Sequence, residues 1–158
     1  MGDFSFNIKS SSDFFKKFVE DYEEFVDNRT SSRLAINCAM TAWHLVDWTY
    51  KEFEALLKPQ FSDFRSYQDG LKSLCPDLKI MQDITNGTKH FAITQYESPI
   101  KTTSLHDGDF DDSFSRDFNI AMLEIEFQDG RTIYFEDVID SVMSFWKQYL
   151  PTTFQIII

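Results

Sequence analysis

The chain has 158 residues, of which 42% are hydrophobic and 16% aromatic, and 17 of them are phenylalanine. This apolar content excludes a disordered chain, and the length suits one domain or a helical lobe with a small β appendage. The net charge of −11 opposes non-specific binding to nucleic acid, because such binding depends on neutralising phosphates. We interpret this charge as a contribution to solubility.

The sequence indicates a cytoplasmic protein. Its two cysteines, Cys38 and Cys75, have no spacing typical of a metal or redox site, which fits a reducing compartment. Residues 1–9 lack the basic and hydrophobic regions of a signal peptide, and Phe6 stands where myristoylation needs serine or threonine. No apolar run approaches the ~20 residues of a membrane-spanning helix, so we expect no membrane contact.

The first half of the chain predicts four helices, of which the first two are long. Apolar side chains recur every three or four residues after the serines at 10–12, which predicts a helix that ends near Asn28. A longer and more apolar helix is capped by Thr30 or Ser31 and ends at Lys58, because a proline follows.

Two shorter helices follow. The third spans about 62–74, although Gly70 within it costs roughly 1 kcal/mol relative to alanine. Pro76 occupies the first turn of the fourth helix, where its missing N–H costs least. Residues 86–87, Asn-Gly, either cap this helix or lie inside a helix that continues through His90.

The second half of the chain predicts strands. Apolar and polar residues alternate over 91–96, and residues 100–104 suit a second short strand. A half-buried strand over 123–127 is followed by Gln-Asp-Gly at 128–130, which supplies the left-handed residues of a hairpin turn. The partner strand covers 131–135.

A last helix starts at Asp137 and is ended by Pro151, and the tail finishes in three isoleucines at 156–158. Because an exposed tail of this kind is sticky, we expect it to dock on a sheet edge or on a partner. The element order predicts an α+β fold, in which a four-helix bundle-like half precedes a small antiparallel β-meander and a C-terminal helix. Residues 1–92 form the helical region and 93–158 the meander with its helix, packed as one compact unit.

A polar stripe on the second helix is the first candidate site. Six polar residues recur at intervals of three and four and therefore share one face: Arg33, Asn37, Thr41, His44, Asp47 and Lys51. The stripe is either a solvated edge, or a buried hydrogen-bond network in which His44 and Asp47 satisfy each other, or the lining of a cleft. In a cleft, Asp47 would orient His44 and Arg33 would receive an anion.

The segment from Asp83 to His90 is the second candidate site. In a helix, Asp83 and His90 lie on one side, with Lys89 beside them. The segment is either a polar helix end, where lysine and histidine favour the negative pole of the helix dipole, or a site that binds phosphate or supplies a general acid or base. Together the two segments give His44 and His90 as candidate catalytic residues and five candidate ligand-binding residues: Arg33, Asn37, Asp47, Asp83 and Lys89.

Residues 107–117 form an acidic loop that imitates the start of a calcium-binding loop. Asp112 stands in place of the central glycine and Phe118 in place of the final glutamate, which excludes an EF-hand. The loop is either a weak divalent-ion site or, as we favour, an acidic loop that binds no ion. The sequence contains no phosphate-binding loop, nucleophile elbow, paired-histidine zinc motif or dinucleotide fingerprint, and we predict no metal and no cofactor.

Two segments resemble known proteins. They are Ala39-Met-Thr-Ala-Trp-His-Leu-Val-Asp-Trp48 and Asp83-Ile-Thr-Asn-Gly-Thr-Lys-His-Phe91. Together they resemble a group of small bacterial and phage proteins that pair an Ala-x-Thr-Ala-Trp-His-Leu-x-Asp-Trp helix with a downstream Asp-Ile-x-Asn-x-x-Lys-His helix. That group is similar to HEPN-type helical domains, and the resemblance covers roughly residues 12–92.

The HEPN resemblance implies a helical bundle, often dimeric, whose active members cleave RNA with an arginine and a histidine that are separated by four to six residues. Here six residues separate Asn37 from His44, and six separate Asp83 from His90, so that neither pair begins with arginine. The charge that develops on the phosphate during cleavage therefore lacks its usual stabiliser.

We expect a non-enzymatic binding or accessory protein of HEPN-like architecture, which acts in phage–host conflict or as a toxin–antitoxin-like component and pairs as a homodimer or with another protein. The competing hypothesis is a metal-independent endoribonuclease that uses His44 and His90, with Arg33 or Lys89 on the phosphate. A third hypothesis is a small-nucleotide binder, although the net charge does not favour RNA or nucleotides. Antiparallel packing of the second and fourth helices is predicted to bring His44 and His90 close together.

Overall fold

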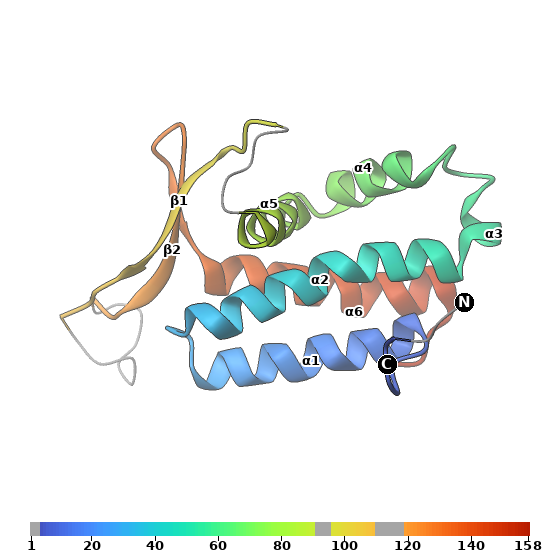
Figure 1. The fold of residues 1–158 in the computed structure, drawn as a ribbon, viewed down its shortest axis with the longest axis horizontal. Coiled ribbons are helices and arrows are strands. Elements are labelled where there is room, and N and C mark those ends of the chain that lie inside the picture. The colour runs from blue at the N-terminus through green and yellow to red at the C-terminus, as the bar shows by residue number, and fades with distance from the viewer. Residues whose placement is uncertain (1–3, 91–95, 110–118) are drawn as a thin grey trace.

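The computed structural model describes residues 4–90, 96–109 and 119–158. The first two helices form an antiparallel pair, α1 (Ser11–Asp27) and α2 (Ser32–Glu52) (Figure 1). Both begin at the serines that the sequence predicts as caps: the Ser10 hydroxyl accepts from the Asp13 N–H, and the Ser31 hydroxyl accepts from the Leu34 N–H. Each cap satisfies a backbone donor that the helix itself leaves free.

The predicted end of the second helix at Lys58 is wrong. Helix α2 stops at Glu52, and a separate single turn, α3 (Glu54–Leu57), follows the break at Phe53. At the break, the Phe53 ring stacks on Phe154, with 4.2 Å between the ring centroids. The helix is interrupted where this aromatic contact forms.

Helices α4 (Phe64–Leu74) and α5 (Asp77–Lys89) correspond to the third and fourth predicted helices. A capping box, in which Asp63 and Ser66 bond each other's backbone N–H, starts α4. Pro76 is the N-cap of α5, and the helix continues through residues 86–87 to Lys89, with His90 as its C-cap. In Figure 1, α5 is viewed nearly end-on beside α2.

The sheet has three antiparallel strands in the order β1 (Ile100–His106), β2 (Met122–Phe127) and β3 (Thr132–Tyr134). The predicted hairpin turn between the last two strands is confirmed, because Gly130 has a φ of 84°. Phe135 belongs to the next helix and not to the strand. Of the strand predicted over 91–96, residues 91–95 lie outside the described part of the chain.

The last helix, α6 (Phe135–Phe154), begins earlier than Asp137 and passes through Pro151, so the predicted end at this proline is wrong. The missing N–H of Pro151 removes one helix hydrogen bond, to the carbonyl four residues earlier, and only one turn follows it. The helix ends instead at Gln155, which has a left-handed φ of 57°.

The C-terminal tail does not dock on a sheet edge. It lies at the end of the helices that is remote from the sheet, close to the N-terminus (Figure 1). Phe154 is buried against Phe53, and Ile156 packs on the core, whereas the Ile157 side chain is 91% exposed. The tail is therefore held within its own chain by Phe154 and Ile156.

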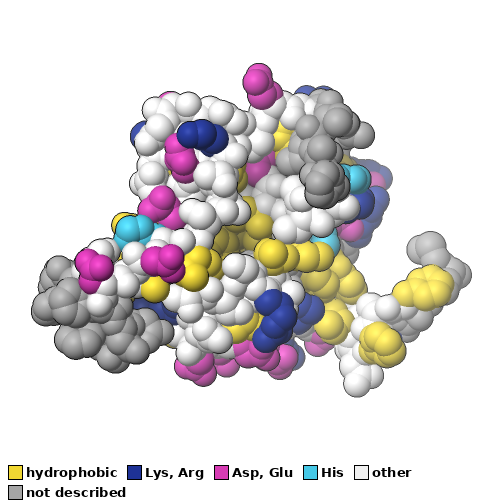
Figure 2. Space-filling view, turned by 60° about the vertical axis from the view of Figure 1, so that its left-hand side comes forward, with side chains coloured by type: hydrophobic (Ala, Val, Ile, Leu, Met, Phe, Trp, Pro, Cys, Tyr) yellow, Lys and Arg dark blue, Asp and Glu magenta, His cyan; other side chains and the backbone are white. Residues whose placement is uncertain are grey.

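The predicted α+β fold is confirmed, and the two halves of the sequence share one hydrophobic core. The core joins fully buried side chains from both: Phe18, Leu45, Tyr67, Met81, Ile125 and Trp146. Figure 2 brings the sheet end forward and shows hydrophobic side chains in the middle of this face and acidic ones along its lower edge. Within the described residues, no helix is long and apolar enough to span a membrane.

The stack of Phe53 on Phe154 gives the first testable prediction. Replacing Phe154 with alanine should lower the free energy of unfolding by about 3 kcal/mol, because the change empties a buried aromatic site. The matched change Ile157→Ala, in an exposed neighbour, should alter it by less than about 0.5 kcal/mol. Urea denaturation measures both, and equal effects of the two changes would show that the tail is not docked.

Candidate functional site between α2, α5 and β1

A cleft of about 270 Å³ lies where α2, α5 and β1 meet. Its lining combines apolar side chains with hydroxyl groups and one carboxylate: Ile36 from α2; Asp83, Ile84, Gly87 and Thr88 from α5; Ser98, Ile100 and Thr103 from the start and middle of the β1 segment. The cleft therefore brings together segments that are more than sixty residues apart in the sequence.

Asp83 is the charged group of the cleft, and its side chain is 1% exposed. The Lys79 ammonium, one helical turn earlier on α5, donates to its Oδ1 atom. The hydroxyl of Tyr96 donates to the same oxygen over 2.6 Å. The negative charge of Asp83 is thus balanced by Lys79, and one of the two carboxylate oxygens carries both bonds.

The other carboxylate oxygen, Oδ2 of Asp83, is buried and has no hydrogen-bond partner among the described residues. A buried acceptor left unpaired costs about 1–3 kcal/mol, and more when it is charged. Such atoms are rare in folded proteins because most buried polar groups are paired. A buried carboxylate with one unpaired oxygen, in a residue that lines a cleft, is the feature that marks this place as a candidate ligand site.

Three neighbouring side chains hold Tyr96 in place. Its hydroxyl donates to Asp83 and accepts from the Asn86 amide over 3.1 Å. The Lys79 ammonium lies 4.5 Å from the centroid of its ring, a cation–π distance. Burial first, and then the bond to Asp83, raise the pKa of Tyr96, so that its hydroxyl remains a donor at neutral pH.

A smaller hollow of about 70 Å³ continues the cleft along the sheet. The two share Ile36, Ile84 and Thr103, and the smaller one extends to Leu123 of β2 and Phe135 of α6. The cleft is therefore one part of a groove between the sheet and the helix pair α2 and α5.

His44 lies on the exposed face of α2, close to the charges of Asp47, Lys17 and Lys89. Partial burial lowers the pKa of His44 most, Asp47 opposes this shift, and the two lysines add to it. At neutral pH the imidazole is therefore uncharged and able to accept a proton. The influence of Lys89 places the C-terminal end of α5 near the middle of α2.

A polar cluster joins α1 to the same part of α2. The Lys17 ammonium donates to Thr41 Oγ1 over 2.7 Å and to Asp21 Oδ2 over 2.6 Å, and the Thr41 hydroxyl donates to Asp21 over 2.5 Å. Thr41 belongs to the predicted polar stripe, and it is buried here in a satisfied network. At Thr41, therefore, the polar stripe has a structural role, because it holds α2 against α1.

The other candidate residues occupy different surroundings. Arg33 is exposed in the first turn of α2, Asn37 is half-buried one turn later, and Asp47 is exposed beside His44. His90 is exposed, and its backbone N–H closes α5 by donating to the Asn86 carbonyl. The proximity of His44 and His90 stays a prediction, supported by the effect of Lys89 on His44.

Of the acidic loop over 107–117, residues 110–117 lie outside the described part of the chain. In the ranges that the structure describes, no group of three or more histidine, cysteine, aspartate or glutamate side chains could hold a metal ion.

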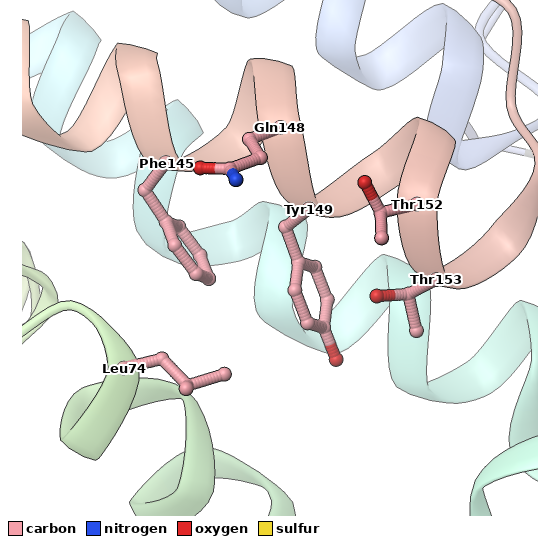
Figure 3. Close-up of a pocket in the computed structure, with 6 residues that line it drawn as sticks. All are labelled: Leu74, Phe145, Gln148, Tyr149, Thr152 and Thr153. Carbon is pink, nitrogen blue, oxygen red and sulfur yellow. The ribbon is translucent and has the colours of Figure 1, made fainter.

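A second hollow, of about 260 Å³, lies between α4 and α6. Figure 3 shows Phe145 and Tyr149 projecting from α6 towards Leu74 of α4, with Thr152 and Thr153 along the helix beyond them. The Leu74 side chain is 67% exposed. This hollow is apolar at its centre and contains no charged side chain in its lining.

Comparison with known proteins found no relative of this chain. No family model, no curated protein and no solved structure matches it.

Sequence reasoning identified Asp83 but missed Lys79 and Tyr96. The spacing of four residues between Lys79 and Asp83 on one helix is a signal that could have predicted their ion pair. Tyr96 gave no such signal, because its place beside Asp83 depends on how the chain returns from α5 to β1.

The pKa of His44 gives the second prediction. By NMR titration of its ring protons, His44 should titrate below the ordinary value of 6.5. Lys89→Gln should raise this pKa by removing a nearby positive charge, and Asp47→Asn should lower it further by removing the negative one. A value above 6.5 in the unchanged protein, or shifts of the opposite sign, would contradict the placement of Lys89 beside His44.

Proposed function

We propose that this protein is a non-enzymatic, cytoplasmic binding protein that holds a small polar ligand in the cleft between α2, α5 and β1. The observation that carries the proposal is the lining of the cleft, in which apolar side chains and hydroxyl groups surround the buried carboxylate of Asp83. A mostly apolar pocket with a few polar groups is the usual form of a site for a small molecule.

The HEPN-like resemblance supports a role for this binding protein as an accessory component, in phage–host conflict or in a toxin–antitoxin-like pair. In such a role the protein responds to a ligand and passes the response to a partner. The groove that extends from the cleft along the sheet supports this arrangement, because an occupant would contact α2, α5 and the strands at once.

The competing function, a metal-independent endoribonuclease, is supported by His44. Its lowered pKa keeps the imidazole ready to accept a proton, and Lys17 and Lys89 supply positive charge near it. Two observations stand against it: His44 lies outside the lining of the cleft, and neither histidine has an arginine separated from it by four to six residues on its N-terminal side. The binding function is therefore the better supported of the two.

Ligand binding in the cleft gives the third prediction. In NMR spectra of isoleucine methyl groups, a subset of polar fragments from a small-molecule library should shift the signals of Ile36, Ile84 and Ile100. Thr103→Trp should abolish these shifts by filling the cleft from β1. Thr102→Trp is the matched control, because the side chain of the preceding strand residue points to the opposite face and should leave binding unchanged.

Two results would contradict this function. The first is a library in which no fragment shifts the three isoleucine signals. The second is cleavage of RNA in the presence of EDTA that is lost in both His44→Ala and His90→Ala, since that activity would make the protein a metal-independent ribonuclease.

The hollow between α4 and α6 supports a further part of the proposal, a homodimer. An apolar face is the usual basis of a two-fold pair, and Leu74, Phe145 and Tyr149 provide apolar surface at this hollow.

As the fourth prediction, light scattering at micromolar concentration should give twice the 18.6 kDa mass of the chain. Leu74→Asp should give the single mass, whereas the control Leu56→Asp, at an exposed leucine outside the hollow, should not. A single mass for the unchanged chain would contradict the dimer.

A further inference from the structure

We infer that the outer edge of β1 binds an extended, basic peptide segment of a partner protein, which adds a strand to the sheet beside β1. The inference goes beyond the small ligand of the cleft, because it assigns the surface on which a partner docks. Three properties of the edge lead to it: the direction of its backbone groups, the exposure of its side chains, and the charge around it.

The hydrogen bonds of the hairpin show which backbone groups of β2 face β1. The Phe127 N–H donates to the Arg131 carbonyl on the β3 side of the hairpin. In an antiparallel sheet, successive residues of a strand direct their N–H and C=O groups to opposite sides. The backbone of Glu124, three residues earlier, therefore faces β1, where its partner is Ser104. Ser104 is thus bonded to β2 through its backbone.

The two neighbours of Ser104 have the opposite orientation. Thr103 and Leu105 direct their N–H and C=O groups away from β2, towards the outer edge of the sheet. Among the described residues, β2 is the one strand that pairs with β1, so these groups have no strand beside them there. A row of such groups is a template for a further strand.

The strand itself is open to solvent. The five side chains from 101 to 105 are exposed, and Leu105 is 47% exposed. Proteins protect sheet edges with charged residues, prolines and bulges. Here the bulge between Ile100 and Thr102 protects one end of β1, whereas residues 102–106 pair with β2 in regular register. The part of the edge that contains Thr103 and Leu105 is therefore available to a partner.

The cleft adjoins this edge on the helix-facing side of the sheet. Thr103 lines the cleft together with Ile84 of α5 and Ile36 of α2. A strand added about 4.8 Å beyond β1 would present every second side chain to the same side of the sheet. Apolar side chains at those positions would lie next to the isoleucines of the cleft. The partner segment is therefore expected to alternate apolar and polar residues.

The charge around the edge selects a basic peptide over a second copy of this chain. Glu97 precedes β1, Asp107 and Asp109 follow it, and all three are exposed. The positive charge of Lys101 on the strand is already paired with Glu126. In either orientation of two paired β1 strands, the carboxylates of one copy would meet those of the other, and like charges repel. Lysine or arginine in the partner segment gives the complementary charge.

Amide hydrogen exchange, followed by NMR, gives the fifth prediction. In the free protein, the Thr103 and Leu105 amides should exchange at least about tenfold faster than the Ser104 amide, which is bonded to β2. A phage-displayed library of random nine-residue peptides supplies the probe, and the enriched sequences should be basic and alternate apolar with polar residues. The synthesised peptide should slow exchange at Thr103 and Leu105 about tenfold or more and leave Ser104 little changed.

Two proline variants test whether the peptide binds at this edge. Thr103→Pro removes an outward N–H and places a ring on the edge, so the affinity measured by fluorescence anisotropy should fall at least about tenfold. Thr132→Pro is the matched control. Thr132 of β3 directs its N–H away from β2 at the opposite edge of the sheet, so this change should leave the affinity unaltered. An edge strand tolerates proline where its N–H faces outward.

Several results would overturn the inference. Slow exchange of Thr103 and Leu105 in the free protein would show that the chain itself, or a second copy, already covers the edge. A library that enriches no peptide, or that enriches acidic peptides, would exclude a basic partner segment. Unchanged exchange at the two amides with bound peptide, or equal affinities of the two proline variants, would place the peptide elsewhere.

The fragment spectra separate this failure from failure of the proposed function. If fragments still shift the isoleucine signals of the cleft, and Thr103→Trp abolishes those shifts, the binding function stands and only the docking surface is wrong.

Discussion

The packing of α2 against its neighbours is the constraint on which the rest of the structure depends. Cys38, Ala39, Ala42, Leu45 and Val46 are completely buried along this helix. The small side chains at 38, 39 and 42 let adjacent helices approach closely, as interdigitated helix packing requires. Since α1 and α5 both pack on α2, the end of α5 comes to lie near the middle of α2. The cleft forms where these two helices meet β1, with Ile36 of α2 in its lining.

The same packing separates the polar residues into two electrostatic groups. On the α1 side, the Thr41 hydroxyl is hydrogen-bonded to both Lys17 and Asp21, so this polar group serves to join two helices. On the α5 side, Asp83 keeps one oxygen free although Lys79 lies within reach of the other. A satisfied polar group on α2 and an unsatisfied one on α5 thus belong to the same core, and of these two residues Asp83 is the one that lines the cleft.

The predictable parts of the fold were those that local interactions decide. Ser10 and Ser31 cap helices through bonds to residues three positions away, and Gly130 adopts the left-handed turn that few other residues tolerate. The predicted ends at Lys58 and Pro151 are wrong, and both lie near a contact between residues that are distant in the sequence, the stacked rings of Phe53 and Phe154. For the site, the sequence identifies Asp83 as a candidate residue, but it does not predict that one oxygen of its carboxylate lacks a hydrogen-bond partner. The surroundings of that oxygen depend on the cleft, which is formed by three segments that are distant in the sequence.

The free oxygen of Asp83 also bears on why a carboxylate occupies this position at all. If Asp83 served only to pair with Lys79, an ion pair on the helix surface would achieve the same at lower cost, because burying both charges loses hydration that the attraction hardly restores. Asp83 instead lies with its side chain almost fully buried, while its partner remains about one-third exposed. The arrangement sacrifices stability, and residues that break the local rules for stability concentrate where proteins bind or react. Lys79 and Tyr96 both bond one oxygen of this carboxylate and thereby fix the Asp83 side chain, as a binding site requires before its ligand arrives.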